Sequence, residues 1–214
     1  GIFIESIKCH HNEFVEYIQI NLLNNTNLNF LSICRKYYNY YFFPDELEID
    51  SNIFYEFCQF DFISIVDLIL NNDDVNLNDL NSYIEIKKYY FPFDEVKIKQ
   101  TPCHAAIQKG NLEIVEMLLK KLNFFYINNK ISYKSKKRSS NYEKTPLSIA
   151  VQNYDIDLVK YFLENLNVDV NMYSNSNSNQ KAKMTPLQLA IMNEDIQMVE
   201  LLLSQPDIDV NKKS

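Results

Sequence analysis

Cysteine and histidine are the residue types of this sequence that bind metal ions most readily, and they occur in two small groups. Cys9, His10 and His11 are consecutive, and Cys103 and His104 form a pair further along the chain. Consecutive side chains of a helix point in different directions, so the first group cannot converge on one ion without distortion. We therefore predict no metal site and no cofactor.

The sequence contains none of the short motifs that mark common catalytic centres. Its only glycines are Gly1 and Gly110, which excludes a glycine-rich phosphate loop, and it has neither a G-x-S-x-G nor an H-E-x-x-H motif. Its carboxylates are scattered over expected helix surfaces and loops. We predict that the chain is not an enzyme.

Positive charge is concentrated in residues 129–144. The cations of this segment include Lys130, Lys134, Lys136, Lys137 and Arg138. We favour a solvated loop tip as its interpretation, and the alternative is a nuclear-localisation signal or an anion-binding site. Ser135, Ser139 and Ser140 lie beside these cations, and phosphorylation there would cancel part of the charge.

The composition restricts the class of protein and its partners. A net charge of −7 over 214 residues and a pI near 5.0 argue against general nucleic-acid binding. The four cysteines form no C-x-x-C pair, which favours a reducing, cytoplasmic location. No apolar run approaches the roughly 18 residues that span a bilayer, so we expect no membrane insertion. Abundant Asn, Tyr and Phe are typical of an AT-rich genome, such as that of a protist, and a first residue other than Met favours a fragment.

Three stretches of the chain share one pattern of helix signals. Each begins with Thr-Pro, continues with small and apolar residues, and passes through a polar break into a second apolar stretch. They read TPCHAAIQKGNLEIVEMLL (101–119), TPLSIAVQNYDIDLVKYFL (145–163) and TPLQLAIMNEDIQMVELLL (185–203). Thr caps a helix and Pro fits its first position, while Asn111, Asp155 and Asp195 are suited to cap the second helix. Each stretch predicts a helix pair that buries its apolar face by stacking on its neighbours.

These stretches resemble the ankyrin repeat, whose first helix carries T-P-L-H-x-A and whose second carries I-V-x-x-L-L. The matching residues are Thr101, Pro102, His104, Ala105, Ala106, Gly110, Ile114, Val115, Leu118 and Leu119; Thr145, Pro146, Leu147, Ala150, Val159 and Leu163; and Thr185, Pro186, Leu187, Ala190, Val199, Leu202 and Leu203. The resemblance implies an all-α, ankyrin-type solenoid of helical hairpins with enlarged finger loops or β-hairpins. It also implies a structural role for His104 and a left-handed backbone at Gly110, Tyr154 and Glu194.

The spacing of the repeats predicts large fingers. The Thr-Pro pairs begin at residues 101, 145 and 185, hence 44 and 40 residues apart, against about 33 in the ankyrin family. The excess falls between the end of one repeat and the next Thr-Pro. We predict a single solenoid over 1–214, with a degenerate repeat at 1–25, an irregular helical segment at 26–50, a degenerate repeat at 51–78, an aromatic finger at 79–100, a repeat at 101–128, a basic finger at 129–144, a repeat at 145–171, a Ser/Asn finger at 172–184 and a repeat at 185–211.

The resemblance implies a non-catalytic module that binds another protein through its fingers and the concave face of its first helices. By the family's pattern, contact residues follow the small residues of each first helix or directly precede Thr-Pro. The first set is Gln108, Lys109, Gln152, Asn153, Met192 and Asn193, with Gln59 and Phe60 in the degenerate repeat, and the second set is Gln100, Lys144 and Met184. The aromatic run of Tyr89, Tyr90, Phe91 and Phe93 has two interpretations, contact with a partner or packing on the neighbouring repeat.

Two other functions remain open. In one, the repeats are a structural spacer or regulatory arm of a larger multidomain protein. In the other, they self-associate through the ends of the stack, which lack obvious polar caps. The partner itself is not identified by the sequence, because similar stacks serve many unrelated roles.

Overall fold

The chain divides into two compact units, Gly1–Glu48 and Ile49–Ser214. The computed structural model describes residues 50–72, 76–80, 82–90, 94–122, 127–135, 140–175 and 183–213, all of them in the second unit. The predicted repeat at 1–25, all but the last residue of the segment at 26–50, and Phe91, Phe93 and Lys136–Arg138 lie outside these ranges.

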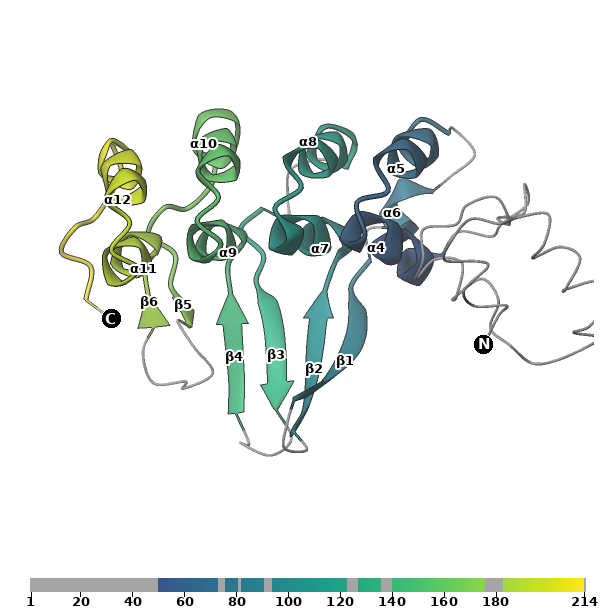
Figure 1. The fold of residues 1–214 in the computed structure, drawn as a ribbon, viewed down its shortest axis with the longest axis horizontal. Coiled ribbons are helices and arrows are strands. Elements are labelled where there is room, and N and C mark those ends of the chain that lie inside the picture. Colours follow the sequence, from purple (N-terminus) through teal and green to yellow (C-terminus); the bar gives the residue numbers. More distant parts are fainter. Residues whose placement is uncertain are drawn as a thin grey trace, which may run out of the picture. The chain divides into compact units, whose positions relative to one another are not determined.

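Helices of the second unit come in consecutive pairs, which form two rows (Figure 1). The pairs are α4 (Ser51–Gln59) with α5 (Ile63–Leu70), α7 (Pro102–Lys109) with α8 (Leu112–Lys121), α9 (Pro146–Gln152) with α10 (Ile156–Asn165), and α11 (Pro186–Met192) with α12 (Ile196–Leu203). The first helices pack on one another in the order α4, α7, α9, α11. A short helix, α6 (Leu77–Leu80), follows α5 in the chain.

Each first helix begins at the residue that the sequence predicts. Thr101, Thr145 and Thr185 accept a hydrogen bond through their side chains from the backbone N–H three residues later, and a proline follows each of them. Asp50 performs the same function at α4, where the sequence has no Thr-Pro pair. The predicted N-caps of the second helices, Asn111, Asp155 and Asp195, are likewise confirmed. Such caps stabilise a helix by about 1 kcal/mol each.

The core lies between the two helix rows and between successive repeats. Small residues at one position of the first helices, Ala106, Ala150 and Ala190, are completely buried and allow neighbouring helices to approach closely. Val115 and Val159 fill the equivalent place in the second helices and are also completely buried. Burial of each such valine side chain contributes about 1.5–3 kcal/mol.

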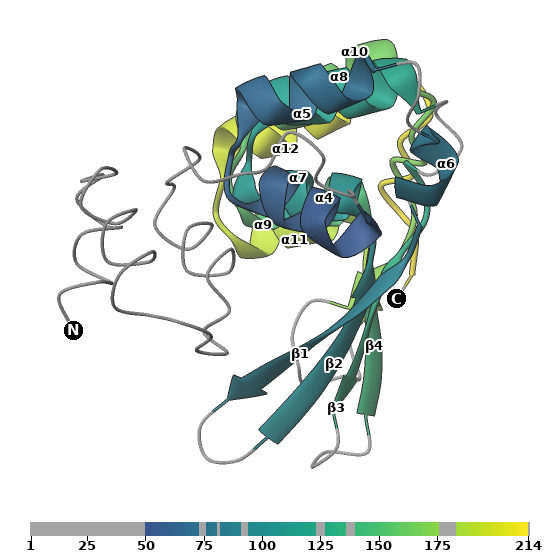
Figure 2. The same cartoon turned by 90° about the vertical axis from the view of Figure 1, so that its right-hand side faces the viewer.

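The fingers are β-hairpins, so the prediction of an all-α fold is wrong in that respect. Strands β1 (Ile84–Tyr90), β2 (Asp94–Gln100), β3 (Ile131–Ser135) and β4 (Ser140–Lys144) form one antiparallel sheet in chain order, called here the finger sheet. β2 and β3 belong to different fingers, and their pairing joins the two hairpins. Short strands β5 (Ser174–Asn175) and β6 (Lys183–Met184) form a separate pair. Figure 2 shows the finger sheet extending away from both helix rows.

The finger sheet has two chemically different sides. Ile84, Ile98 and Ile131 are buried on the side that packs toward the first helices, called here the helix side. The residues next to each isoleucine along its strand lie on the opposite side, called here the outer side, because successive side chains of a strand point to opposite faces. Lys87 and Lys134 are exposed there. Apolar residues that recur at every second position favour a strand, whereas a helix would need them at intervals of three or four residues. This pattern explains why these segments form strands.

The turn between the helices of a repeat requires a left-handed backbone. Gly110 has φ 75°, and Tyr154 and Glu194, at the same place in the next two repeats, have φ 59° and 56°. The predicted left-handed conformation at all three positions is thus confirmed. Asp61 has φ 62° between α4 and α5.

Candidate functional site

The predicted contact residues of the first helices lie at the carboxyl ends of α7, α9 and α11. Lys109, Asn153 and Met192 are exposed there, while Gln108, Gln152 and Asn193 are half-buried. We call these six residues the first-helix row. Each repeat contributes two adjacent members, so the row continues across three repeats.

Hydrogen bonds tie the first-helix row to the finger sheet and to the next repeat. The Gln108 side chain donates from Nε2 to the Tyr133 hydroxyl of β3 at 2.9 Å. Asn153 Nδ2 donates to the backbone oxygen of Gln108 at 3.1 Å, and the Lys109 ammonium lies 6.0 Å from the ring centre of Phe60. These contacts limit the motion of the side chains before any partner binds.

The predicted contacts at the base of the fingers lie in different environments. Lys144 donates from Nζ to Gln152 Oε1 at 2.6 Å, and its burial lowers the pKa of the ammonium. Met184 is half-buried on β6. Gln100 is completely buried and donates from Nε2 to the Tyr55 hydroxyl of α4. A partner cannot reach Gln100 while the fold is intact, so it is not a surface contact.

The aromatic pair that the structure shows is not part of the aromatic run that the sequence singled out. The backbones of Tyr89 and Tyr90 belong to β1, and Phe91 and Phe93 lie outside the described residues. The pair that the structure brings together is Tyr133 and Tyr142, whose rings stack with centres 4.5 Å apart and planes 3° apart. Alternation of apolar and polar residues in 131–135 is the sequence signal that could have placed Tyr133 on the helix side.

His104 has the structural role that the sequence implies. Its Nδ1 accepts a hydrogen bond from the backbone N–H of Thr101 at 3.1 Å, and its Nε2 donates to the backbone oxygen of Asn129 at 3.1 Å. This pattern requires the neutral imidazole, and burial lowers the pKa of His104 to about 4. Both ring nitrogens are therefore occupied. Within the described ranges, no three His, Cys, Asp or Glu side chains are grouped to hold a metal ion.

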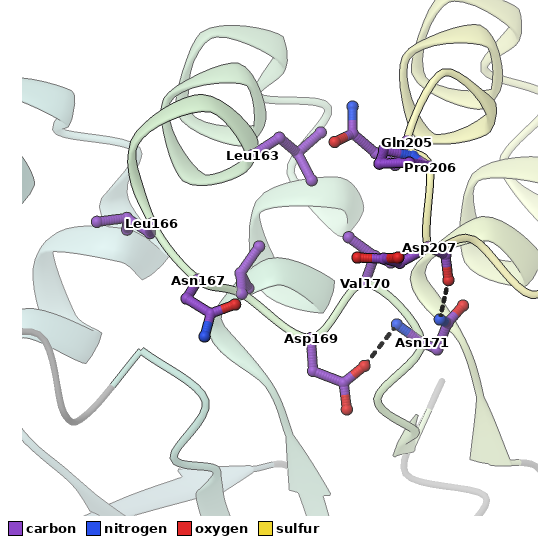
Figure 3. Close-up of a pocket in the computed structure, with 10 residues that line it drawn as sticks. Leu163, Leu166, Asn167, Asp169, Val170, Asn171, Gln205, Pro206 and Asp207 are labelled. Atoms are coloured by element: carbon purple, nitrogen blue, oxygen red, sulfur yellow. Dashed lines mark hydrogen bonds between the residues drawn. The ribbon is translucent and has the colours of Figure 1, made fainter.

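A pocket of about 350 Å³ lies between the loops that follow α10 and α12 (Figure 3). Leu163, Leu166 and Val170 are among its apolar lining residues. On its polar side, Asn171 donates from its backbone N–H to Asp169 Oδ1 at 2.9 Å and from Nδ2 to the Asp207 backbone oxygen at 2.7 Å. These groups already hold one repeat to the next, so the pocket wall serves the stacking of repeats.

The same asparagine bridge occurs one repeat earlier. Asn128 donates from Nδ2 to the Asn167 backbone oxygen at 3.1 Å and accepts from the Asp169 N–H at 2.9 Å. Asn171 makes the matching pair with Asp207 and with the Asp209 N–H, the latter at 2.9 Å. Each asparagine thus satisfies a donor and an acceptor in the following loop.

Comparison with known proteins gives the family to which these features correspond. A family model for ankyrin repeats (3 copies) matches residues 11–173 and, in a second match, residues 123–214. Comparison with curated proteins gives no match. Among solved structures, the chain is similar to the ankyrin repeat domain of Bcl-3, with 17% sequence identity and a TM-score of 0.48 over 96% of this chain and 72% of that chain. In the part of the chain that the structure describes, no helix combines the length and apolar character needed to cross a bilayer.

Proposed function

The chain belongs to the ankyrin-repeat family, and from that premise we propose that it binds another protein where its first helices meet the finger sheet. Ankyrin repeats are generally protein–protein interaction modules and are typically non-catalytic. The proposed surface consists of the first-helix row and the adjoining base of the finger sheet, where Lys144 is half-buried. By the family's pattern, this surface is the concave face of the stack.

The observation that supports this surface is an exposed side chain two or three residues after the buried alanine of each first helix. Lys109, Asn153 and Met192 are exposed on three successive repeats, although Ala106, Ala150 and Ala190 a few residues earlier are completely buried. Burial of the small residues fixes the backbone of each first helix, and with it the helix end that carries the exposed residue. A rigid row of this kind costs little conformational entropy on binding.

Side chains of the row differ in the energy they can supply. Met192 is 48% exposed and is an unbranched apolar side chain, so it can adapt to a pocket on a partner. Asn153 and Gln108 offer hydrogen bonds that set the register of a bound segment. We propose that Met192 provides the apolar contact. Few residues supply most of the energy of such interfaces.

The test compares two sets of substitutions in the full chain. The first replaces Gln108, Asn153 and Met192 with alanine. The matched control replaces Glu113, Lys160 and Gln197, which are exposed on the second helices, also with alanine and also without a change in net charge. Proteins bound to each immobilised variant are quantified by mass spectrometry, and circular dichroism checks the fold.

We expect a partner bound by the wild type and the control to be lost from the first-helix variant. A partner retained equally by all three would reject the proposed surface, and the spacer interpretation would then be preferred. Loss from both variants would point to a general effect on the stack.

Self-association is a second candidate, supported by apolar side chains exposed in the last repeat. Ile191, Leu203 and Val210 are 57%, 47% and 59% exposed. Sedimentation velocity over a range of concentrations tests it, because an association through these residues gives a sedimentation coefficient that rises with concentration. A constant monomer value would exclude this candidate.

A further inference from the structure

The outer side of the finger sheet carries lysines that the strand pairing places in one line. Lys87 of β1 lies opposite Lys97 of β2, and Lys97 lies opposite Lys134 of β3. We call these three residues the lysine row. Like charges directly opposite each other destabilise a sheet, so the row lowers the stability of the isolated fold. It is also a local exception in a chain whose net charge is −7.

One carboxylate of the chain already occupies part of the lysine row. Glu85 Oε1 accepts a hydrogen bond from Lys97 Nζ at 2.7 Å. That hydrogen bond, with the charges of Lys97, Lys87 and Lys134, lowers the pKa of the Glu85 carboxyl. Glu85 thus shows which chemical group the lysine row accommodates.

The two outer members of the row are not neutralised in this way. Lys87 and Lys134 are exposed and form no ion pair within the described residues. The carboxylate of Glu143 on β4 pairs with Lys130 at 3.5 Å. Glu95, further along β2, contributes its charge at Lys97. Lys87 and Lys134 therefore remain available on either side of the Lys97–Glu85 pair.

We infer that the lysine row binds an extended, carboxylate-rich segment of a partner protein, with Lys87 and Lys134 each holding one of its carboxylates. Neighbouring strands lie about 4.8 Å apart, so the outer lysines start from backbones about 10 Å apart. An extended peptide rises about 3.3 Å per residue and its side chains alternate between two faces, so carboxylates two or four residues apart, about 7 or 13 Å, face the row together, and the long lysine side chains can reach either spacing. The spacing of two lysines matches a short peptide segment, and nucleic acid is the competing ligand that the test includes.

This surface is distinct from the one proposed above. The lysine row lies on the outer side of the finger sheet, while Tyr133, which bonds to Gln108, is buried toward the helix side. Loss of binding at one surface therefore leaves the other intact, and the two proposals fail independently.

The experiment uses the full chain and a fluorescein-labelled peptide of about ten residues made of Glu and Ser, with binding followed by fluorescence anisotropy at low ionic strength. The site variant is K87Q/K134Q. The matched control is K121Q/K160Q, which removes two exposed lysines from α8 and α10 and changes the net charge equally. A third variant, K87E/K134E, is offered a peptide of Lys and Ser.

We expect the affinity for the acidic peptide to fall about fivefold in K87Q/K134Q and to stay within about twofold of wild type in the control. The charge-reversed variant is expected to bind the basic peptide, and all binding is expected to weaken with salt. Equal loss in the site and control variants would overturn the inference, as would absence of wild-type binding at low ionic strength. An oligonucleotide of matched charge that binds as tightly as the acidic peptide, with the same loss in K87Q/K134Q, would also overturn it.

Discussion

The left-handed residue in the turn between two helices is strained in some repeats and not in others. Gly110 adopts its φ of 75° without steric cost, whereas Tyr154 and Glu194 adopt φ 59° and 56° with a Cβ atom present. The left-handed conformation costs an L-residue about 1–2 kcal/mol. Glycine avoids this cost but loses more conformational entropy on folding, by about 0.5–1 kcal/mol.

We expect Tyr154→Gly and Glu194→Gly each to stabilise the protein by up to about 1 kcal/mol, because the relief of strain exceeds the added entropy. The melting temperature should rise by about 1–4 °C, as measured by calorimetry. The matched control is Asn193→Gly, directly before Glu194 at φ −80°, where the change should lower the melting temperature. A fall for all three variants would contradict the strain argument.

At Gly110 we expect the reverse substitution, from glycine to alanine, to destabilise the protein. A Cβ atom added there would lie 2.8 Å from Asp155 Oδ2, at a φ that an L-residue rarely adopts. Asp155 also caps α10, so moving its carboxylate weakens that cap. We expect Gly110→Ala to reduce the free energy of unfolding by at least about 1 kcal/mol, measured by urea denaturation, and an unchanged midpoint would refute this.

The imidazole of His104 makes stability depend on pH. Its pKa in the folded protein is about 4, below the usual value of about 6.5 in an unfolded chain. The unfolded state therefore binds more protons between these values, and stability present above pH 6.5 is lost as the pH falls to 4. From the size of the shift, we expect this loss to be about 2–3 kcal/mol.

The last repeat supplies a suitable substitution for testing this dependence. Gln188 replaces His104 at the same position, where its Oε1 accepts from the Thr185 N–H and its Nε2 donates to the Lys212 backbone oxygen, both at 3.0 Å. His104→Gln should therefore keep both hydrogen bonds without a titrating group. We expect its free energy of unfolding to change less than that of the wild type between pH 7 and pH 4. Parallel pH curves would show that His104 is not the source.

At the scale of elements, the loops that follow the second helices are joined by asparagine side chains. Asn171 bonds to the loop after α12 through two hydrogen bonds. Asn211 occupies the same position in the last repeat and is exposed, with no following loop among the described residues. We expect Asn171→Ala to cost about 1–2 kcal/mol and Asn211→Ala less than about 0.5 kcal/mol in urea unfolding. If both substitutions lowered the free energy of unfolding equally, the hydrogen bonds of Asn171 to the next loop would not stabilise the stack.

Sequence predicts the helices of this protein better than its sheet, for a physical reason. A helix begins at a local signal such as Thr101 followed by Pro102, and those signals lie within four residues of the bonds they form. The pairing of β2 with β3 joins residues of two different fingers, so its register depends on how neighbouring repeats stack. The lysine row depends on that register and could not be located from the sequence.

The contact residues were only partly predictable. One of the two positions after the small residues of each first helix is exposed and the other is half-buried, because the repeat pattern itself encodes which side faces out. Gln100 was expected to be a surface contact but is buried against Tyr55 of α4, a degenerate repeat without the Thr-Pro signal. That long-range contact has no local sequence marker.

At the scale of the whole described stack, burial at one position depends on whether another repeat follows. Ile107 and Val151 are 1% and 0% exposed, and Ile191, their equivalent in the last repeat, is 57% exposed. The residue type is nearly constant, so the difference arises from the next repeat, which covers the first two. Stability in such stacks is a sum of repeat and interface terms.

This difference predicts that one substitution has unequal effects along the stack. Val151→Ser places a hydroxyl in a completely buried site and should cost about 2–4 kcal/mol. Ile191→Ser should cost less than about 1 kcal/mol, because its side chain is already in contact with water. Chemical denaturation of both variants checks this. Similar losses would mean that Ile191 is covered in solution, as self-association would require.

The alternation of side chains in β2 also limits how the long hairpin can change in length. Inserting or deleting one residue within the strand would turn Lys97 toward the helices and Ile98 into solvent. Changes of two residues keep every side chain on its original side. Viable relatives and engineered versions of this hairpin should therefore differ by even numbers of residues inside the strands, with odd-numbered changes confined to the connecting tip.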